Sequence, residues 1–259
     1  MRILITGASR GLGRAMSARL AQPGNQLALC ASAPSAELDA IVAECTAQGA
    51  QVIGLTGDLS QAAVPARLVQ EAVAGIGGLD GVVSNAGVAS PGRLTDIDDA
   101  AWERLFAINT RGPWLLAKAA YPHLKASRGA MVAVASMSGV EPYPGNGAYS
   151  ATKAALIMLV RTLAQEWAAD GVRVNAVSPG LFHTAMTAPI YADPEKKAAR
   201  EALVPMHRIG DPARDCAGLV EFLLSPDAGY MTGQNIIADG GLLGSIQTHL
   251  AGRPKSGAQ

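Results

Sequence analysis

Tyr149 and Lys153 are the two residues of this sequence best suited to proton chemistry. They lie four residues apart, and Ser136 precedes Tyr149 by thirteen positions. On a helix, positions i and i+4 share a face, so a phenol with an ordinary pKa of about 10 would lie beside a cation. The cation favours the phenolate, and we therefore expect the pKa of Tyr149 to be lowered. A tyrosine tuned in this way can give or take a proton at a carbonyl or an alcohol.

The same spacing occurs a second time, from Tyr121 to Lys125. In this copy Pro122 follows the tyrosine, and no serine lies thirteen residues upstream. The chain thus contains an internal control, which we expect to be ordinary surface without a chemical role. The surroundings of the two copies must decide between them.

The composition limits the classes of function. Of 259 residues, 49% are hydrophobic and 16% are charged, which suits one well-buried α/β domain. The net charge is zero without basic or acidic blocks, so nothing favours a nucleic-acid partner. No apolar run approaches the roughly 20 residues that span a bilayer, and we expect a cytoplasmic protein without a membrane partner. Cys30, Cys45 and Cys216 lack metal-ligand spacing and are expected to be buried thiols in a reducing compartment, with no metal site.

Short apolar runs alternate with longer helical patterns along the chain. The runs are continuously hydrophobic, as parallel strands covered on both faces are. Their alternation with helices predicts right-handed crossovers and a doubly wound α/β sheet. The expected strands are Ile3–Thr6, Gln26–Ala31, Gln51–Thr56, Gly81–Ser84, Ala130–Ala135, Arg173–Val177 and Asn235–Ala238. The expected helices are Leu12–Ala21, Ala36–Gln48, Ala62–Ile76, Asp98–Ala126, Ala148–Ala169 and Ala213–Leu224.

A single domain over residues 1–259 is expected, because no linker or repeat interrupts this pattern. Residues 181–212 form a long, proline-rich connection with a charged short-helix candidate at Pro194–Ala202. Connections of this length often cover sites, and we interpret this one as a substrate lid. Residues 242–259 form a C-terminal tail whose last few residues are expected to be frayed.

A glycine-rich turn follows the first expected strand and opens the first helix. Glycines allow a tight turn and a close approach of backbone to phosphate. The following helix terminus offers free N–H groups and a positive dipole end to that phosphate. Because a strand precedes the turn and a helix follows it, the pattern predicts a dinucleotide site. Its members are Gly7, Ser9, Arg10, Gly11, Leu12 and Gly13.

The end of the second strand bears on the choice of nucleotide. An acid at this position would hold the adenosine ribose and indicate NAD, but the sequence reads Cys30-Ala31-Ser32-Ala33. Arg10, inside the glycine turn, is a candidate cation for a 2′-phosphate. We therefore expect NADP(H) to be favoured, with Arg10 and Ser32 as contacts, and NAD(H) to be the alternative.

These features belong to a longer series of motifs that resembles the short-chain dehydrogenase/reductase family over nearly the whole chain. Any one motif can occur by chance, but all of them in order are specific. They are the spacing Gly7–Gly13, Asp58-Leu59 after the third strand, Asn85-Ala86-Gly87 after the fourth, Asn109 in the central helix, then Ser136, Tyr149 and Lys153, and finally Pro179-Gly180 with Thr184.

The resemblance implies a Rossmann-type three-layer αβα sandwich with a seven-stranded parallel sheet in the order 3-2-1-4-5-6-7. It also implies hydride transfer between a nicotinamide and a ketone, aldehyde or alcohol. Homodimers or homotetramers are common in the family, with the helices at Asp98–Ala126 and Ala148–Ala169 in contact.

The same resemblance assigns roles to the catalytic set. Tyr149 is the acid or base, and Lys153 lowers its pKa and holds the nicotinamide ribose. Ser136 binds the substrate oxygen, and the backbone carbonyl of Asn109 holds a water on a relay to Lys153. The implied cofactor site includes Asp58 and Leu59 beside the adenine, together with Asn85, Ala86, Gly87, Tyr149, Lys153, Pro179, Gly180 and Thr184.

Several of these residues also have simpler explanations. Asp58 resembles the N-cap of a helix beginning near Ser60, and Asn85 resembles a turn residue. Asn109 is less easily explained in this way, because a buried amide needs partners. Ser138 is an alternative to Ser136, but the family places its serine three residues before a glycine, and Gly139 fits Ser136.

The substrate pocket is expected to use a mostly apolar group of residues with few fixed charges. This favours a neutral or moderately hydrophobic ketone or secondary alcohol as the small-molecule partner. The residues are Ser138, Val88, Tyr143, Met186 and Tyr191.

Four alternative functions follow from parts of the pattern. A 3-oxoacyl-carrier-protein reductase would be expected to carry an arginine where Asp170 stands before Gly171. An NAD-linked catabolic alcohol or sugar dehydrogenase would differ in its nucleotide. A methyltransferase would not need Ser136, Tyr149 and Lys153 together. A dinucleotide-binding regulator without catalysis usually lacks the tyrosine or the lysine.

Overall fold

Seven apolar segments form one parallel sheet in the order β3-β2-β1-β4-β5-β6-β7, which confirms the predicted order. In β1, Ile3 lies opposite Leu27 of β2 on one side and Gly81 of β4 on the other. Strands β4 and β5 are buried at every residue, as their continuous hydrophobicity predicts. The strands are β1 Arg2–Thr6, β2 Gln26–Ala31, β3 Gln51–Thr56, β4 Gly81–Ser84, β5 Ala130–Val134, β6 Arg173–Pro179 and β7 Asn235–Ala238.

Helices connect the strands, and local side chains fix where several of them begin. The Ser35 hydroxyl accepts a hydrogen bond from the Leu38 amide at the start of α2. The Asp98 carboxylate accepts one from the Ala101 amide at the start of α4. Both satisfy amides that have no partner inside the helix. The helices are α1 Gly11–Leu20, α2 Ala36–Ala47, α3 Val64–Ile76, α4 Asp99–Phe106, α5 Gly112–Ser127, α6 Tyr149–Trp167, α7 Ala188–Tyr191, α8 Pro194–Leu203 and α9 Gly218–Leu224.

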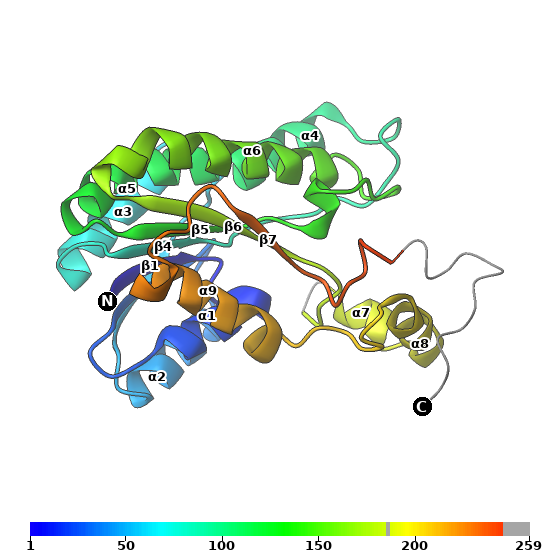
Figure 1. Cartoon of the computed structure of the whole chain (residues 1–259), viewed down its shortest axis with the longest axis horizontal. Coiled ribbons are helices and arrows are strands. Elements are labelled where there is room, and N and C mark those ends of the chain that lie inside the picture. Colours follow the sequence, from blue (N-terminus) through cyan, green and yellow to red (C-terminus); the bar gives the residue numbers. More distant parts are fainter. Residues whose placement is uncertain (185–186, 246–259) are drawn as a thin grey trace.

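The sheet lies between two helical layers, which confirms the three-layer sandwich. Helices α3, α5 and α6 cover one face, and α1, α2 and α9 cover the other (Figure 1). Each face has its own core, centred on residues such as Leu116 and Leu156 on the first and Met16 and Leu223 on the second. Helices α7 and α8 lie apart from both layers, at one end of the sheet (Figure 1).

The computed structural model describes residues 1–184 and 187–245. Met186, which we predicted to line the substrate pocket, lies outside the described residues, as does the tail from residue 246 onward. Among the described residues, no helix combines the length and the apolarity needed to cross a membrane.

The central helix differs from the continuous element predicted at Asp98–Ala126. It divides into α4, a π-helical turn at Ala107–Arg111, and α5. A π turn inserts one extra residue into the helical repeat and often accompanies a functional site. Asn109 lies within this turn. The segment predicted at Ala213–Leu224 likewise begins with a π turn, at Pro212–Ala217, before α9.

Residues 181–212 leave the sheet after β6 and return to it before α9. The two ends of this segment are hydrogen-bonded to each other, because the Gly210 amide donates to the Leu181 carbonyl at 2.8 Å and the His183 amide donates to the Gly210 carbonyl at 3.1 Å. Arg208 adds a bidentate ion pair with Asp215. The segment is therefore fixed at its base.

Candidate active site

The predicted site residues gather at the carboxyl ends of the strands. The glycine turn follows β1, Asn85 follows β4, Ser136 follows β5, and Gly180 follows β6. Since all the strands are parallel, these ends share one edge of the sheet. In open α/β sheets, ligands bind at this edge where the strand order reverses, and here that point lies between β1 and β4.

The glycine turn is held in a conformation that larger residues would not permit. Gly7 has φ of +63°, in the left-handed region that favours glycine. A Cβ on Gly13 would lie 2.0 Å from the carbonyl oxygen of Gly7. The Asn85 amide nitrogen donates to the Thr6 and Gly7 carbonyls at 3.1 and 3.0 Å. Asn85 therefore stabilises the glycine turn and is more than a turn residue after β4.

The start of α1 fits a phosphate group. The N-cap residue Arg10 has extended backbone and an exposed side chain that makes no capping hydrogen bond. Thr184 lies over the turn, because a Cβ on Gly11 would lie 3.5 Å from the Thr184 Cβ. An uncapped helix N-terminus with glycines that bring backbone close suits a pyrophosphate. The residues present therefore fit a dinucleotide.

The end of β2 is open and carries no acid. Ser32, which we expect to contact the nucleotide, is exposed there. Glu37, in the first turn of α2, has a lowered pKa, mainly because of a hydrogen bond from its own backbone, with a smaller contribution from the nearby Arg10 charge. The Arg10 charge thus acts on the first turn of α2, the helix that follows β2.

Asp58 occupies the turn after β3. Its carboxylate accepts from the Ser60 amide at 2.9 Å and pairs with Arg104 at 3.4 Å, and both lower its pKa, the backbone bond most. Because α3 begins only at Val64, Asp58 is not the N-cap of that helix. The adjacent Leu59 is buried.

Asn109 is fully buried, and both the oxygen and the nitrogen of its side-chain amide have hydrogen-bond partners. Its oxygen accepts from the Val88 amide at 2.9 Å, and its nitrogen donates to the Val88 carbonyl at 2.8 Å and to Thr152 Oγ1 at 3.1 Å. The π turn thus fastens the loop after β4 to α6. Val88, which we expected to line the substrate pocket, is held through its backbone in this arrangement.

Ser136 and Tyr149 form the half-buried part of the predicted catalytic set. Ser136 follows β5, and its hydroxyl accepts from the Ser138 amide at 3.1 Å. Tyr149 is the first residue of α6 and is half-buried. Burial raises the pKa of Tyr149, and hydrogen bonding with the Ser136 side chain opposes this. The predicted lowering of the Tyr149 pKa is therefore wrong, because desolvation of the phenolate dominates.

Lys153 forms the buried half of the set. Its side chain is 3% exposed, and its Nζ donates to the Val134 carbonyl at 2.8 Å. The Nζ lies 5.7 Å from the centre of the Tyr149 ring. Burial lowers the Lys153 pKa to about 8. The predicted i, i+4 pair thus exists, with a cation that loses its proton more readily than a surface lysine does.

Two glycines make this arrangement possible. A Cβ on Gly87 would lie 3.4 Å from both Lys153 Nζ and Asn109 Oδ1, so these three residues surround one small space. A Cβ on Gly139 would lie 2.7 Å from the Lys153 carbonyl carbon. The turn that follows Ser136 therefore packs directly on α6, and this sets Ser136 beside Tyr149.

The second tyrosine–lysine pair, Tyr121 and Lys125, makes a structural contact between two helices. The Tyr121 hydroxyl hydrogen-bonds to Asp170, and Lys125 pairs with the same carboxylate at 2.7 Å. The Tyr121 ring lies 4.7 Å from that of Trp167. The prediction of ordinary surface is therefore wrong. Tyr121 and Lys125 thus connect α5 to the end of α6. The Asp170 carboxylate is already paired with both of them.

A cavity of about 500 Å³ is lined by Met137 and Ser138, which directly follow Ser136 in the chain, while Ser136 and Tyr149 are not among its lining residues. Of the predicted substrate residues, Ser138 and Tyr143 line it, whereas Val88 and Tyr191 do not. Sequence reasoning missed its charged residues, Glu141 and Arg200. The full lining is Met137, Ser138, Glu141, Pro142, Tyr143, Leu181, Arg200, Leu203, Leu242, Leu243 and Ser245.

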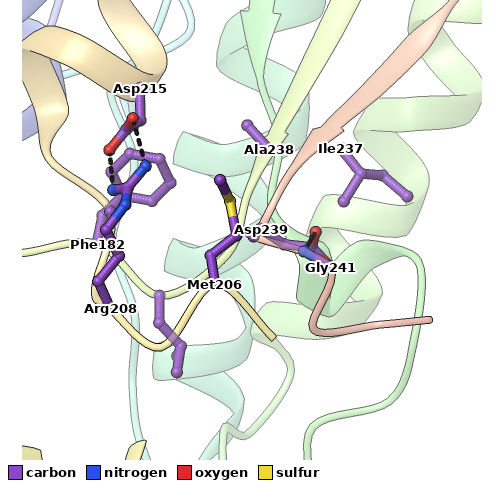
Figure 2. A pocket seen from close by; sticks show the side chains of 11 residues that line it. Phe182, Met206, Arg208, Asp215, Ile237, Ala238, Asp239 and Gly241 are labelled. Atoms are coloured by element: carbon purple, nitrogen blue, oxygen red, sulfur yellow. Dashed lines mark hydrogen bonds and ion pairs between the residues drawn. The ribbon is translucent and has the colours of Figure 1, made fainter. Parts of the chain in front are cut away.

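A second, smaller cavity of about 350 Å³ lies where residues 181–212 meet β7 (Figure 2). Arg208 and Asp215 face each other across one wall, and Met206 and Asp239 lie on the other side (Figure 2). Its charged groups already have partners, because Asp239 accepts from the Gly241 and Leu243 amides. We interpret it as the inner surface of the fixed base described above.

Comparison with known proteins agrees with this geometry. Residues 7–243 match the family model described as enoyl-(acyl carrier protein) reductase. The chain is 37% identical to dehydrogenase/reductase SDR family member 4 of Pongo abelii, over 92% of this chain and 86% of that protein. It superposes on a short-chain type dehydrogenase/reductase from Mycobacterium marinum with a TM-score of 0.86 and 31% identity, covering 93% and 94% of the chains. The RhlG/NADP active-site complex of Pseudomonas aeruginosa gives 0.85 and 31%, covering 93% and 95%.

The chain belongs to the short-chain dehydrogenase/reductase family. It is an oxidoreductase that interconverts carbonyl and alcohol groups and binds NAD(P). Within the described part of the chain, no three His, Cys, Asp or Glu side chains gather to hold a metal ion.

The short-chain dehydrogenase/reductase motifs could not reveal the missed pocket residues. Arg200 and Leu203 come from α8, and Leu242 and Leu243 follow β7. These segments meet the Ser136 turn only through the tertiary fold. The one available signal was the charged helical pattern at Pro194–Ala202, which does not say which of its charges turns inward.

The buried Lys153 predicts a pH-dependent stability. Below about pH 8 both the folded and the unfolded chain carry the proton, and folding desolvates the ammonium. Above that pH the folded chain releases it, while the unfolded chain keeps it up to its ordinary value of 10.5. The unfolded state then binds more protons, so stability rises with pH. Relative to Lys153→Met, the wild-type free energy of unfolding should rise by about 2 kcal/mol between about pH 7.5 and about pH 9.5.

Urea denaturation of the two proteins across this range measures the difference. Other titrating groups contribute equally to the free energies of unfolding of the two proteins, so their contributions cancel in the difference. A difference that stays constant with pH would show that Lys153 keeps an ordinary pKa.

Proposed function

We propose that this enzyme reduces a ketone with NADPH, with Tyr149 as the proton donor, Ser136 as the ligand of the substrate oxygen and Lys153 as the cation behind them. One observation carries the proposal. The Ser136 side chain acts on the Tyr149 phenol, and the Lys153 ammonium lies 5.7 Å from the same ring, at the sheet edge next to the glycine turn. The cavity of about 500 Å³ begins at Met137 and Ser138, which directly follow Ser136 in the chain.

Tyr149, Lys153 and Ser136 have different roles in the proposed proton transfer. Burial keeps Tyr149 protonated at neutral pH, which is the form that an acid needs to reduce a ketone. Lys153, with a pKa of about 8, is mainly a cation at neutral pH and favours the phenolate once the proton has left. Ser136 stabilises the charge that develops on the substrate oxygen. Asn109 positions Lys153 through Thr152 and Val88, and its backbone carbonyl is the proposed water ligand.

The dinucleotide would lie along the carboxyl edge of the sheet. The bound nicotinamide supplies the hydride. The uncapped start of α1 would face the pyrophosphate, and Thr184 lies over that turn. Asp58 and Leu59 would lie beside the adenine. We assign to this site Gly7, Ser9, Arg10, Gly11, Leu12, Gly13, Ser32, Asp58, Leu59, Asn85, Ala86, Gly87, Tyr149, Lys153, Pro179, Gly180 and Thr184.

Tyr149→Phe tests the proton donor. Removing the phenol should lower kcat by about 10²-fold or more, the usual scale for losing general acid–base help, while the Kd for NADPH stays within about twofold. Steady-state kinetics and a fluorescence titration measure the two quantities.

Tyr121→Phe is the matched control, because it removes a phenol at the same spacing from a lysine. It should keep kcat and lose about 1 kcal/mol of stability, since Asp170 loses a hydrogen bond. Equal kcat for Tyr149→Phe and the control would refute the assignment.

The preference for NADP(H) rests on the charges around the end of β2. Ser32 offers a hydroxyl and no negative charge there, and Arg10 lies exposed at the N-cap of α1. A guanidinium in this position suits a 2′-phosphate. The Pseudomonas aeruginosa relative, at 31% identity, is described as an NADP complex, which supports the same preference.

Arg10→Ala should therefore raise the KM for NADPH by about tenfold or more and leave the KM for NADH nearly unchanged, because only NADPH carries the phosphate. Arg14→Ala is the control, since Arg14 lies one turn further along α1 and is already paired with Glu44. Both constants follow from absorbance assays with one ketone. A wild-type enzyme that uses NADH as well as NADPH would contradict the proposal.

We also propose a homodimer or homotetramer formed through α5 and α6. Large apolar side chains lie exposed on these helices, with Trp114 of α5 43% and Met158 of α6 59% accessible. Such side chains favour burial against a second copy. Light scattering should give a dimer or tetramer for the wild type and a smaller species for Met158→Glu. A monomeric wild-type protein would rule this out.

Residues 181–212 complete the proposal as a substrate lid of the single domain. Leu181, Arg200 and Leu203 from this segment line the cavity beside Ser136. Cys30, Cys45 and Cys216 are free and buried, which supports the cytoplasm as the working compartment.

A further inference from the structure

We propose that Arg200 binds a carboxylate on the substrate, so that this enzyme acts on oxo acids or hydroxy acids rather than on neutral ketones. The inference rests on the proposed function, because it takes Ser136 and Tyr149 as the reacting end of the cavity. It begins from a charge that the fold brings into the cavity and leaves without a carboxylate partner among the described residues.

Arg200 differs from the other long basic side chains of residues 181–212. Lys196 pairs with Asp193 at 2.9 Å, Lys197 pairs with Glu201 at 3.8 Å, and Arg208 makes its bidentate pair with Asp215. Arg200 has no carboxylate within ion-pair distance among the described residues. It is half-buried and lines the cavity. A guanidinium in this position keeps its hydrogen-bond donors for a ligand.

The Arg200 side chain is held in place by aromatic rings. Its guanidinium lies 5.6 Å from the centre of the Tyr191 ring, within the range of a cation–π contact. The Tyr191 ring in turn stacks on His183, with 5.6 Å between their centres. Tyr191 is only 7% exposed. Stacking of this kind orders the guanidinium before a ligand binds, and this lowers the entropic cost of binding.

Tyr191 acts on Arg200 through its ring alone. Its hydroxyl is buried and has no hydrogen-bond partner among the described residues. Because Tyr191 does not line the cavity, this hydroxyl does not contact a ligand there, and Arg200 is the residue that would bind the charged end of the substrate.

The rest of the cavity suits a small oxo acid. Met137 and Ser138, next to Ser136, form one side, and Arg200 and Leu203 of α8 form another. The volume of about 500 Å³ lies within the range of small-molecule sites. Glu141 is the other charged residue of the lining; it is exposed and does not pair with Arg200. The reacting carbonyl would lie at Ser136 and the carboxylate at Arg200.

A carboxylate suits Arg200 because the planar guanidinium fork matches its two oxygens. The test compares levulinate with methyl levulinate, a pair of ketones that differ in this charge and in one ester methyl group. Arg200→Gln should raise the KM for levulinate by about tenfold or more, with kcat within about twofold, and leave the KM for the ester unchanged. Arg200→Lys should recover part of the loss, since it restores the charge without the fork.

Lys197→Gln is the matched control, because Lys197 lies on the same helix and is paired with Glu201. It should change neither KM. Equal effects of Arg200→Gln on the acid and the ester, or no effect on either, would overturn the assignment. Stronger competition by inorganic phosphate than by acetate would also overturn it, in favour of a phosphate ester.

Calorimetry separates this inference from the proposed function. Levulinate should bind to Tyr149→Phe loaded with NADP⁺, and the double variant with Arg200→Gln should bind it about tenfold more weakly or worse. If levulinate binds in this way but no ketone is turned over, the proposed function fails and the carboxylate site stands. If methyl levulinate is turned over but levulinate neither binds nor reacts, the carboxylate site fails and the reductase stands.

Discussion

A buried ammonium at the end of a central strand is the constraint on which the site depends. Lys153 leaves α6, passes into the interior and donates to the last carbonyl of β5. Taking a lysine out of water is unfavourable, as its lowered pKa shows. The surrounding residues must therefore be small or must offer polar groups. Gly87 and Gly139 provide the space, and Asn109 provides the bracing between the loop after β4 and α6.

Much of the fold could be predicted from the sequence, because continuous apolar strands and the turns between them are local signals. The bounds of β2, β3, β4 and β7 agree to the residue, and the strand order follows from a family resemblance carried by several motifs. The division of the central helix was not predictable in this way. The Asn109 side chain in its π turn is hydrogen-bonded to Val88 and Thr152, which are distant in sequence, and no local pattern marks such partners.

The candidate site shows the same limit. The types and spacing of Ser136, Tyr149 and Lys153 were visible, but the direction of the Tyr149 pKa was not, because burial is a sum over the whole fold. Arg200 could not be singled out among the charges of α8 for the same reason. The Tyr121–Lys125 copy makes the point directly, since an identical spacing becomes a joint around Asp170 when the neighbours differ.

Because the base of residues 181–212 is fixed, the shape of the cavity can change without a large loss of folding stability. Its ends are already joined by the bonds between Leu181, His183 and Gly210 and by the Arg208–Asp215 pair. For a loop with joined ends, doubling the intervening length costs only about 0.6 kcal/mol in closure entropy. Insertions, deletions and substitutions between the ends can therefore reshape the larger cavity while the sheet and the positions of Ser136, Tyr149 and Lys153 stay intact. In evolutionary terms, this segment is where the shape of that cavity can vary at little risk to folding.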